Sequence, residues 1–175
     1  MGYSRLFILV EGDDDERFIQ RVVGPALAAR YDSVEVWKYQ NRKKEKTRAF
    51  LRSLACMRAH YFYLADINRS PCVTGRKSKL RKALRKSIDP GKAIIVIKEI
   101  ESWYPAGLND ERMRSLLGKV VPTTDDLTKE QFNALIPRRF DSRVDFMMEV
   151  LKSFSPKVAA RRNRSFPYFR EKVGL

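Results

Sequence analysis

Acidic side chains follow three apolar segments of this 175-residue chain, where they are placed to do chemistry. Glu11 follows the first segment, Asp66 a later one, and Glu99 and Glu101 the last, while Asp15 lies one helical turn after Glu11. Converging carboxylates repel one another and are costly to desolvate unless a cation compensates their charge. Oxygen ligands without nearby His or Cys suit Mg²⁺ or Mn²⁺, which can align phosphates and generate a hydroxide nucleophile. The pattern therefore predicts a divalent-metal site for phosphodiester chemistry.

The elements that must position these acids alternate between strand and helix patterns. Such alternation indicates βαβ units, so we predict an α/β fold with a parallel sheet between helices and right-handed crossovers. The carboxyl ends of parallel strands meet at one edge of the sheet, where functional groups gather. The strands are expected at residues 6–10, 34–39, 60–65 and 93–97, and the helices at residues 13–29, 46–59 and 76–88.

The pattern changes after Trp103 to short helical stretches separated by prolines. These stretches are expected at residues 110–117, 128–135 and 143–154. We therefore predict an α/β core at residues 1–105 and a helical C-terminal lobe at residues 106–175 that packs on the core. If the last strand extends beyond residue 97, Glu99 and Glu101 share one of its faces.

Histidine and cysteine chemistry is not expected. His60 is the only histidine and opens the third strand, so at ~3.3 Å per residue it lies ~20 Å from Asp66. Cys56 and Cys72 form no CxxC motif, which argues against a zinc site of the usual kind and for reduced thiols. No apolar segment approaches the ~20 residues of a membrane span, and no secretory signal is recognisable, so we expect a cytoplasmic protein.

The chain carries 36 Lys and Arg against 21 Asp and Glu, a net charge of +15. Residues 42–48, 76–86 and 157–172 hold essentially all of this excess, which favours a polyanionic partner over solvated helix faces. Segment 76–86 lacks the Trp and Phe residues of a membrane-surface helix, so nucleic acid is the favoured partner. The residues expected to bind it are Arg76, Lys77, Lys79, Arg81, Lys82, Arg85, Lys86, Arg161, Arg162 and Arg164.

Three of these segments resemble the motifs of TOPRIM domains. The strand Ile8-Leu9-Val10 leading into Glu11-Gly12-Asp13-Asp14-Asp15 is similar to the first TOPRIM motif. Asp66-Ile67-Asn68 stands where that family has Asp-x-Asp. Ile100-Glu101-Ser102-Trp103 resembles the acidic-Trp segment of TOPRIM-like proteins related to the overcoming-lysogenization-defect nucleases. The resemblance spans about residues 5–105.

The resemblance implies a TOPRIM-like Rossmannoid sheet of about four strands and a Mg²⁺- or Mn²⁺-dependent nuclease acting on DNA or RNA. It also implies an effector of a phage-defence or toxin system that works beside a separate ATPase subunit. The metal ligands would be Glu11, Asp15, Asp66 and Glu101, with Lys98 as an electrostatic helper. Asn68 replaces the second aspartate, and it offers a carbonyl oxygen without negative charge.

Other interpretations remain open. A binding module with a degraded acid site would grip nucleic acid without cutting it, and Asn68 favours that interpretation. Asp66 and Asn68 also suit a simple turn, and acids after Gly12 also suit a helix cap. A phosphoacceptor switch could use Asp66 and Lys98, but the high positive charge and the Glu-Gly turn argue against it. Phe166, Tyr168 and Phe169 lie among arginines and could stack on bases, although a docked C-terminal helix explains them better.

Overall fold

The computed structural model of the protein describes residues 3–175 and contains a four-stranded parallel sheet. The strands are β1 (Arg5–Val10), β2 (Ser33–Lys38), β3 (His60–Asp66) and β4 (Ala93–Val96), in the order β2-β1-β3-β4. Ile8 in β1 lies opposite Val36 of β2 on one side and Phe62 of β3 on the other. The strand order therefore reverses between β1 and β3, and the crevice at such a reversal is where parallel sheets bind ligands.

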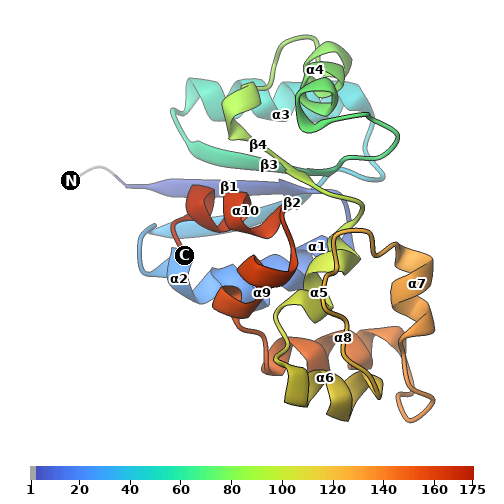
Figure 1. Ribbon diagram of the computed structural model, residues 1–175. Coiled ribbons are helices and arrows are strands. Elements are labelled where there is room, and N and C mark those ends of the chain that lie inside the picture. Colours follow the sequence, from blue (N-terminus) through green and yellow to red (C-terminus); the bar gives the residue numbers. More distant parts are fainter. Residues whose placement is uncertain (1–2) are drawn as a thin grey trace. The chain divides into compact units, whose positions relative to one another are not determined.

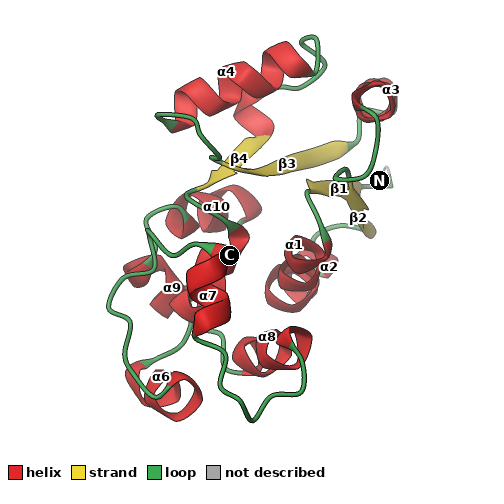
Figure 2. Cartoon of the chain, turned by 90° about the vertical axis from the view of Figure 1, so that its right-hand side faces the viewer, coloured by secondary structure: helices red, strands yellow, loops and turns green. Residues whose placement is uncertain are grey.

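Helices cover both faces of this sheet (Figures 1 and 2). One face carries α3 (Lys44–Cys56) and α4 (Val73–Ala83). The other carries α1 (Asp13–Phe18), the π-helical turn η1 (Ile19–Val23) and α2 (Gly24–Ala28). Because both faces of β1 are covered, its residues from Leu6 to Val10 are all buried and apolar. The fold-class prediction is confirmed.

The core beneath α3 and α4 is built from alternate strand residues. Phe7, Leu9 and Tyr63 point to this face and pack with Leu54 of α3 and Leu80 of α4. The alternation follows from the two-residue period of a strand, which sends Leu6 and Ile8 to the opposite face. The last two residues of β1 therefore hold the start of α1 and the end of β3 at fixed positions along one edge.

The first helical region differs from the single helix expected at residues 13–29. Its middle turn, η1, is π-helical, and α2 begins directly after it with Pro25 in its first turn. Proline has no backbone N–H to donate to the carbonyl four residues earlier, so the regular helical ladder is interrupted here. The helix axis nevertheless continues to Ala28.

The chain divides into two compact units, one ending at Ile95 and the other comprising Val96–Leu175. The second unit is helical. Its elements are η3 (Ile100–Ser102), α5 (Trp103–Ala106), α6 (Asp110–Leu117), α7 (Lys129–Ala134), α8 (Arg143–Lys152), α9 (Pro156–Arg162) and α10 (Phe166–Val173). The boundary expected at residue 105 falls inside α5, because Trp103 and Tyr104 already belong to the aromatic core of the second unit.

That core is dense in aromatic rings. Trp103 is fully buried and makes ring contacts with Phe166 and Phe169 of α10, at centroid distances of 5.4 and 4.7 Å. Gly107 is required by this packing, because a Cβ there would lie 2.3 Å from the ring of Phe154. Phe166 and Phe169 are thus core residues, which rules out the stacking role considered for them. Among residues 3–175, no helix combines the length and apolar character that a bilayer span needs.

Candidate functional site

The β1–α1 turn places two of the predicted acids. Glu11 is half-buried at the end of β1, and Asp15 is only 7% exposed in the first turn of α1. The Gly12 N–H donates to Oδ2 of Asp15 at 3.1 Å, so Asp15 also caps its own helix. Gly12 leaves room for the neighbouring strand end, since a Cβ there would lie 2.8 Å from Oε1 of Gln40.

The other acids of this turn are neutralised by nearby bases. Lys38 bridges Oδ1 of Asp13 at 2.8 Å and Oε2 of Glu16 at 2.7 Å. Asp14 pairs with Arg17 at 2.7 Å. These acids therefore serve the helix start, as the capping interpretation expects, and they leave Glu11 and Asp15 as the acids that face the sheet edge.

The third acid ends β3. Asp66 is half-buried, with Oδ1 shielded from solvent, and its backbone carbonyl accepts a hydrogen bond from Nε of Arg76 at 2.7 Å. That bond holds the first turns of α4 beside the end of β3. Asn68 lies in an exposed turn with φ of 50°, closed by the Ser70 N–H donating to the Ile67 carbonyl. A left-handed turn residue is a common role for asparagine.

Tyr39, just after β2, shows that the three acids gather at one edge. Its hydroxyl donates to the Leu64 carbonyl at 2.7 Å, and its ring stacks on Tyr63 at 4.7 Å. Burial raises the pKa of Tyr39 well above its usual value, and the charges of Glu11, Asp15 and Asp66 raise it further. All three carboxylates are therefore within electrostatic range of one hydroxyl, and together they are called the carboxylate edge.

The donor chemistry of the carboxylate edge suits Mg²⁺ or Mn²⁺, because all three acids offer hard oxygen atoms. Their arrangement does not yet amount to a metal centre: residues 3–175 contain no group of three or more His, Cys, Asp or Glu side chains arranged to hold an ion. Asp15 in addition spends one oxygen on the Gly12 N–H. The metal-ligand set stays a prediction.

Lys98, Glu99 and Glu101 belong to the second unit, and the expectation of an extended strand there is wrong. β4 ends at Val96, and Lys98 turns the chain with φ of 63° before η3 begins. Glu99 accepts a hydrogen bond from the Lys129 N–H and so caps α7. Lys98 lies 3.9 Å from Oδ1 of Asp126, an exposed pair that contributes little.

Glu101 is 3% exposed and is compensated by cations of its own unit. Oε1 of Glu101 accepts from Nη2 of Arg143 at 2.7 Å and lies 3.6 Å from Nζ of Lys129. A buried carboxylate needs such partners, because losing one leaves an uncompensated charge. Arg143 and Lys129 are thus functional candidates that sequence reasoning missed, since nothing in the local spacing links residue 101 to residues 129 and 143.

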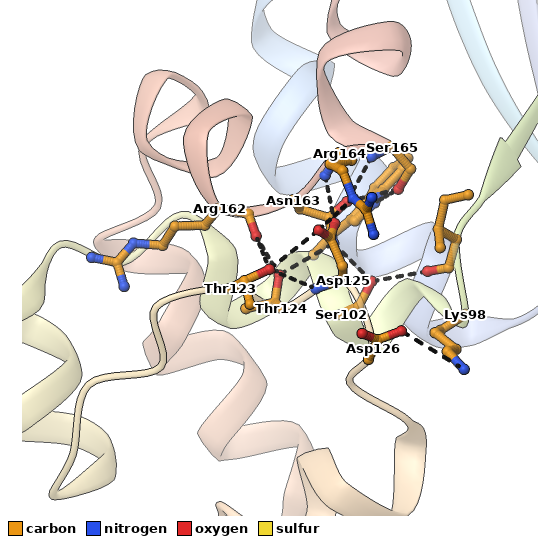
Figure 3. Close-up of polar contacts among 12 residues, drawn as sticks. Lys98, Ser102, Thr123, Thr124, Asp125, Asp126, Arg162, Asn163, Arg164 and Ser165 are labelled. Carbon is orange, nitrogen blue, oxygen red and sulfur yellow. Dashed lines mark hydrogen bonds and ion pairs between the residues drawn. The ribbon is translucent and has the colours of Figure 1, made fainter.

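A polar network holds the segment that carries Glu101 (Figure 3). Nδ2 of Asn163 donates to Oγ of Ser102 and to Oγ1 of Thr124, both at 3.2 Å. Oδ1 of Asn163 accepts from Ser165, whose own hydroxyl accepts from Nε1 of Trp103 at 2.8 Å. Because the network is buried and joins three distant segments, it fixes the backbone on either side of Glu101. The sequence offered no signal for it.

The predicted nucleic-acid-binding residues differ in availability. In α4 and the turn after it, Lys79, Arg81, Lys82, Arg85 and Lys86 are exposed, Lys77 is half-buried, and Arg76 is committed to Asp66. Expected helix 76–88 is wrong at its end, because α4 stops at Ala83 and the next bases lie in a turn.

The C-terminal bases are mostly structural. Arg162 donates to the Val121 carbonyl at 2.9 Å and pairs with Asp110. Arg164 pairs with Asp125 at 2.8 Å, although its side chain is largely exposed. Only Arg161 among the three predicted here is exposed without such a contact among the described residues. The expectation that all three serve nucleic acid is therefore not supported for Arg162.

Comparisons with known proteins identify the fold. No protein-family model and no curated protein matches the chain. Among solved structures, it is similar to the C-terminal region of the OLD protein of Burkholderia pseudomallei, with 18% identity, coverage of 98% of this chain and 100% of that one, and a TM-score of 0.51. The corresponding region of the Xanthomonas campestris pv. campestris OLD protein gives 19% identity, coverage of 100% and 98%, and a TM-score of 0.50. The chain shares the fold of these regions along its whole length.

Alkaline pH should test the packing of the carboxylate edge. Burial raises the pKa of Tyr63 to about 12 and that of Tyr39 further, whereas tyrosines in an unfolded chain ionise near ~10. Their contribution to stability is therefore complete below pH ~10 and is lost as pH rises from ~10 towards ~12. Tyr39→Phe should flatten the fall of the unfolding midpoint in this window, with the exposed Tyr3→Phe as control. Identical pH profiles for wild type and Tyr39→Phe would contradict this.

Proposed function

We propose that the protein is a metal-dependent nuclease that cleaves phosphodiester bonds of DNA or RNA. The observation that carries the proposal is the carboxylate edge: Glu11, Asp15 and Asp66 gather around Tyr39 at the point where the strand order reverses. Arg76 ties the basic helix α4 to the same edge through the Asp66 carbonyl. Acids beside a ready supply of positive charge suit a phosphate polymer, because the bases seat the backbone while the acids act on one bond.

Glu11, Asp15 and Asp66 are the residues that would hold Mg²⁺ or Mn²⁺, and the ion, when bound, neutralises phosphate charge and makes a bound water more acidic. Because these acids are not arranged as a ligand group in the described residues, binding has to draw them together. The exposed bases of α4 hold the polymer, and Tyr39 stays protonated and fixes the ends of β2 and β3 against each other. The fold shared with OLD C-terminal regions supports the proposal without deciding it.

A binding module is the second candidate, and two observations favour it. Asn68 lies on an exposed turn with no charge to offer an ion, and no group of acids in residues 3–175 is already arranged as a metal site. Such a module would use the same bases to grip DNA or RNA. A role in phage defence or as a toxin effector, and a separate ATPase subunit as partner, belong to the nuclease proposal.

The deciding experiment is a cleavage panel on single-stranded DNA, duplex DNA and RNA with Mg²⁺, Mn²⁺ or EDTA. We expect cleavage of at least one polymer with either ion and none in EDTA, because the acids need a cation to act on phosphate. Binding of nucleic acid that is equally strong in EDTA and never followed by cleavage would exclude the nuclease and support the module.

A further inference from the structure

A basic pocket lies at the opposite end of the sheet from the carboxylate edge. It has a volume of about 660 Å³, within the ~300–1,000 Å³ typical of small-ligand sites. Its charged lining consists of Arg58, Arg81, Lys86 and Lys92, with His60 and a single acid, Asp89. β3 runs from His60 at the pocket to Asp66, which separates the pocket from the carboxylate edge by ~20 Å at ~3.3 Å per residue.

The bases of this pocket are available to a ligand. None of its four Lys and Arg side chains forms an ion pair with a carboxylate among residues 3–175, and Lys92 lies 4.5 Å from the ring centre of Tyr61. Asp89 is occupied as a cap, since its Oδ1 accepts from the Gly91 N–H at 2.8 Å. The pocket therefore presents positive charge that the protein itself does not neutralise.

Two helices end at this pocket in the same unusual way. After α3, Arg58 takes φ of 51°, and the Arg58 and Ala59 N–H groups donate to the carbonyls of Ala55 and Leu54. After α4, Arg85 and Lys86 take φ of 46° and 62° and donate to the carbonyls of Lys82 and Arg81. Glycine is the usual residue at this left-handed position after a helix, because it carries no Cβ.

A cation near a helix C-terminus gains some stability from the helix dipole, and that effect alone would favour bases here. It does not account for the number of charges. Each helix end supplies roughly half a negative charge, so two ends and Asp89 balance about two of the four positive charges. Strained backbone at basic residues around a cavity points to function, because glycine would have served the fold with less strain.

We propose that the basic pocket binds a backbone phosphate of the nucleic acid, so that a strand contacts the protein at both ends of β3. The exposed bases of α4 connect the two sites, since α4 begins beside Asp66 and ends at the pocket. The proposal rests on the nucleic-acid partner of the proposed function but not on cleavage. A strand with one charge per ~3.4 Å would place about six phosphates across the ~20 Å between the sites.

The double variant Arg58→Gly/Lys86→Gly tests the pocket, because glycine fits the left-handed backbone and removes only charge. Binding of a labelled single-stranded oligonucleotide of about 15 nucleotides is measured in EDTA by fluorescence anisotropy across a salt series. We expect affinity to fall about tenfold or more and the slope of log K against log salt to shrink by about 1 to 2, since each lost phosphate contact removes about 0.9. The thermal midpoint should stay unchanged or rise.

Arg85→Gly is the matched control, because Arg85 has the same backbone conformation but does not line the pocket. An equal loss of affinity and slope in this control would overturn the proposal in favour of diffuse charge. Competition by inorganic phosphate or a mononucleotide at lower concentration than the oligonucleotide would also overturn it, since the pocket would then be a small-molecule site. Pocket-dependent binding without cleavage in any metal would sink the nuclease and leave the pocket standing.

Discussion

Asp66→Asn is expected to lower the rate of metal-dependent cleavage by at least about a hundredfold. The substitution keeps the size of the side chain and removes one of three negative charges at the carboxylate edge. A metal ion contributes several kcal/mol of charge stabilisation, and each ~1.4 kcal/mol is a factor of ten in rate. Binding of nucleic acid in EDTA should be unchanged or tighter, because a charge that repels phosphate is lost.

Asp13→Asn is the matched control for this experiment. Asp13 lies in the first turn of α1, close in sequence to Glu11 and Asp15, but its side chain is 76% exposed and paired with Lys38. Its variant should cleave at the wild-type rate. If Asp66→Asn and Asp13→Asn cleave equally well, the carboxylate edge is not the catalytic site.

Glu101→Gln separates two roles of the second unit. If Glu101 only balances Arg143 and Lys129, the variant loses stability but the folded fraction cleaves normally. If Glu101 belongs to the metal-ligand set, cleavage by the folded fraction falls with it and a higher Mn²⁺ concentration partly restores the rate. Measuring the unfolding free energy and the metal dependence on the same sample decides between these roles.

Trp103→Ala is expected to lower the free energy of unfolding by about 3–5 kcal/mol, the largest stability effect we predict. The substitution removes a fully buried ring that contacts Phe166 and Phe169, and it leaves Ser165 without the indole donor. The remaining aromatic rings are anchored to separate helices and cannot collapse fully into the cavity. Urea denaturation followed by circular dichroism measures the change.

Trp103→Phe should cost less than Trp103→Ala, because most of the cavity stays filled. Val144→Ala, at a side chain that is 44% exposed, should change the free energy of unfolding by less than about 0.5 kcal/mol. A Trp103→Ala variant as stable as Val144→Ala would show that this core is not the support of the second unit. Since Trp103 follows Glu101 closely in the chain, the cleavage rate of its folded fraction also reports how strictly Glu101 must be held.

The alternation of apolar segments and helical patterns predicted much of the α/β fold because both signals are local. Leu6 to Val10 must be buried on both faces, and the strand period then sends Glu11 and Asp66 to the same edge. The metal-ligand set is less determined by sequence, because it depends on side-chain convergence that residues 3–175 do not show. Asn68 could be read as a ligand or as a turn residue, and its left-handed backbone now accounts for the turn.

By itself, the sequence determined the parallel sheet, the acids that follow its strands and the concentration of positive charge in α4, because each depends on neighbours in the chain. Only the tertiary structure decided that Arg143 and Lys129 compensate Glu101, that Asn163 holds the segment around it, and that Arg162 supports the fold. It also decided that two helices end in basic left-handed turns at one pocket. The reason is physical: a buried charge or cavity takes its partners from whatever packing brings close, and sequence spacing carries no record of that distance.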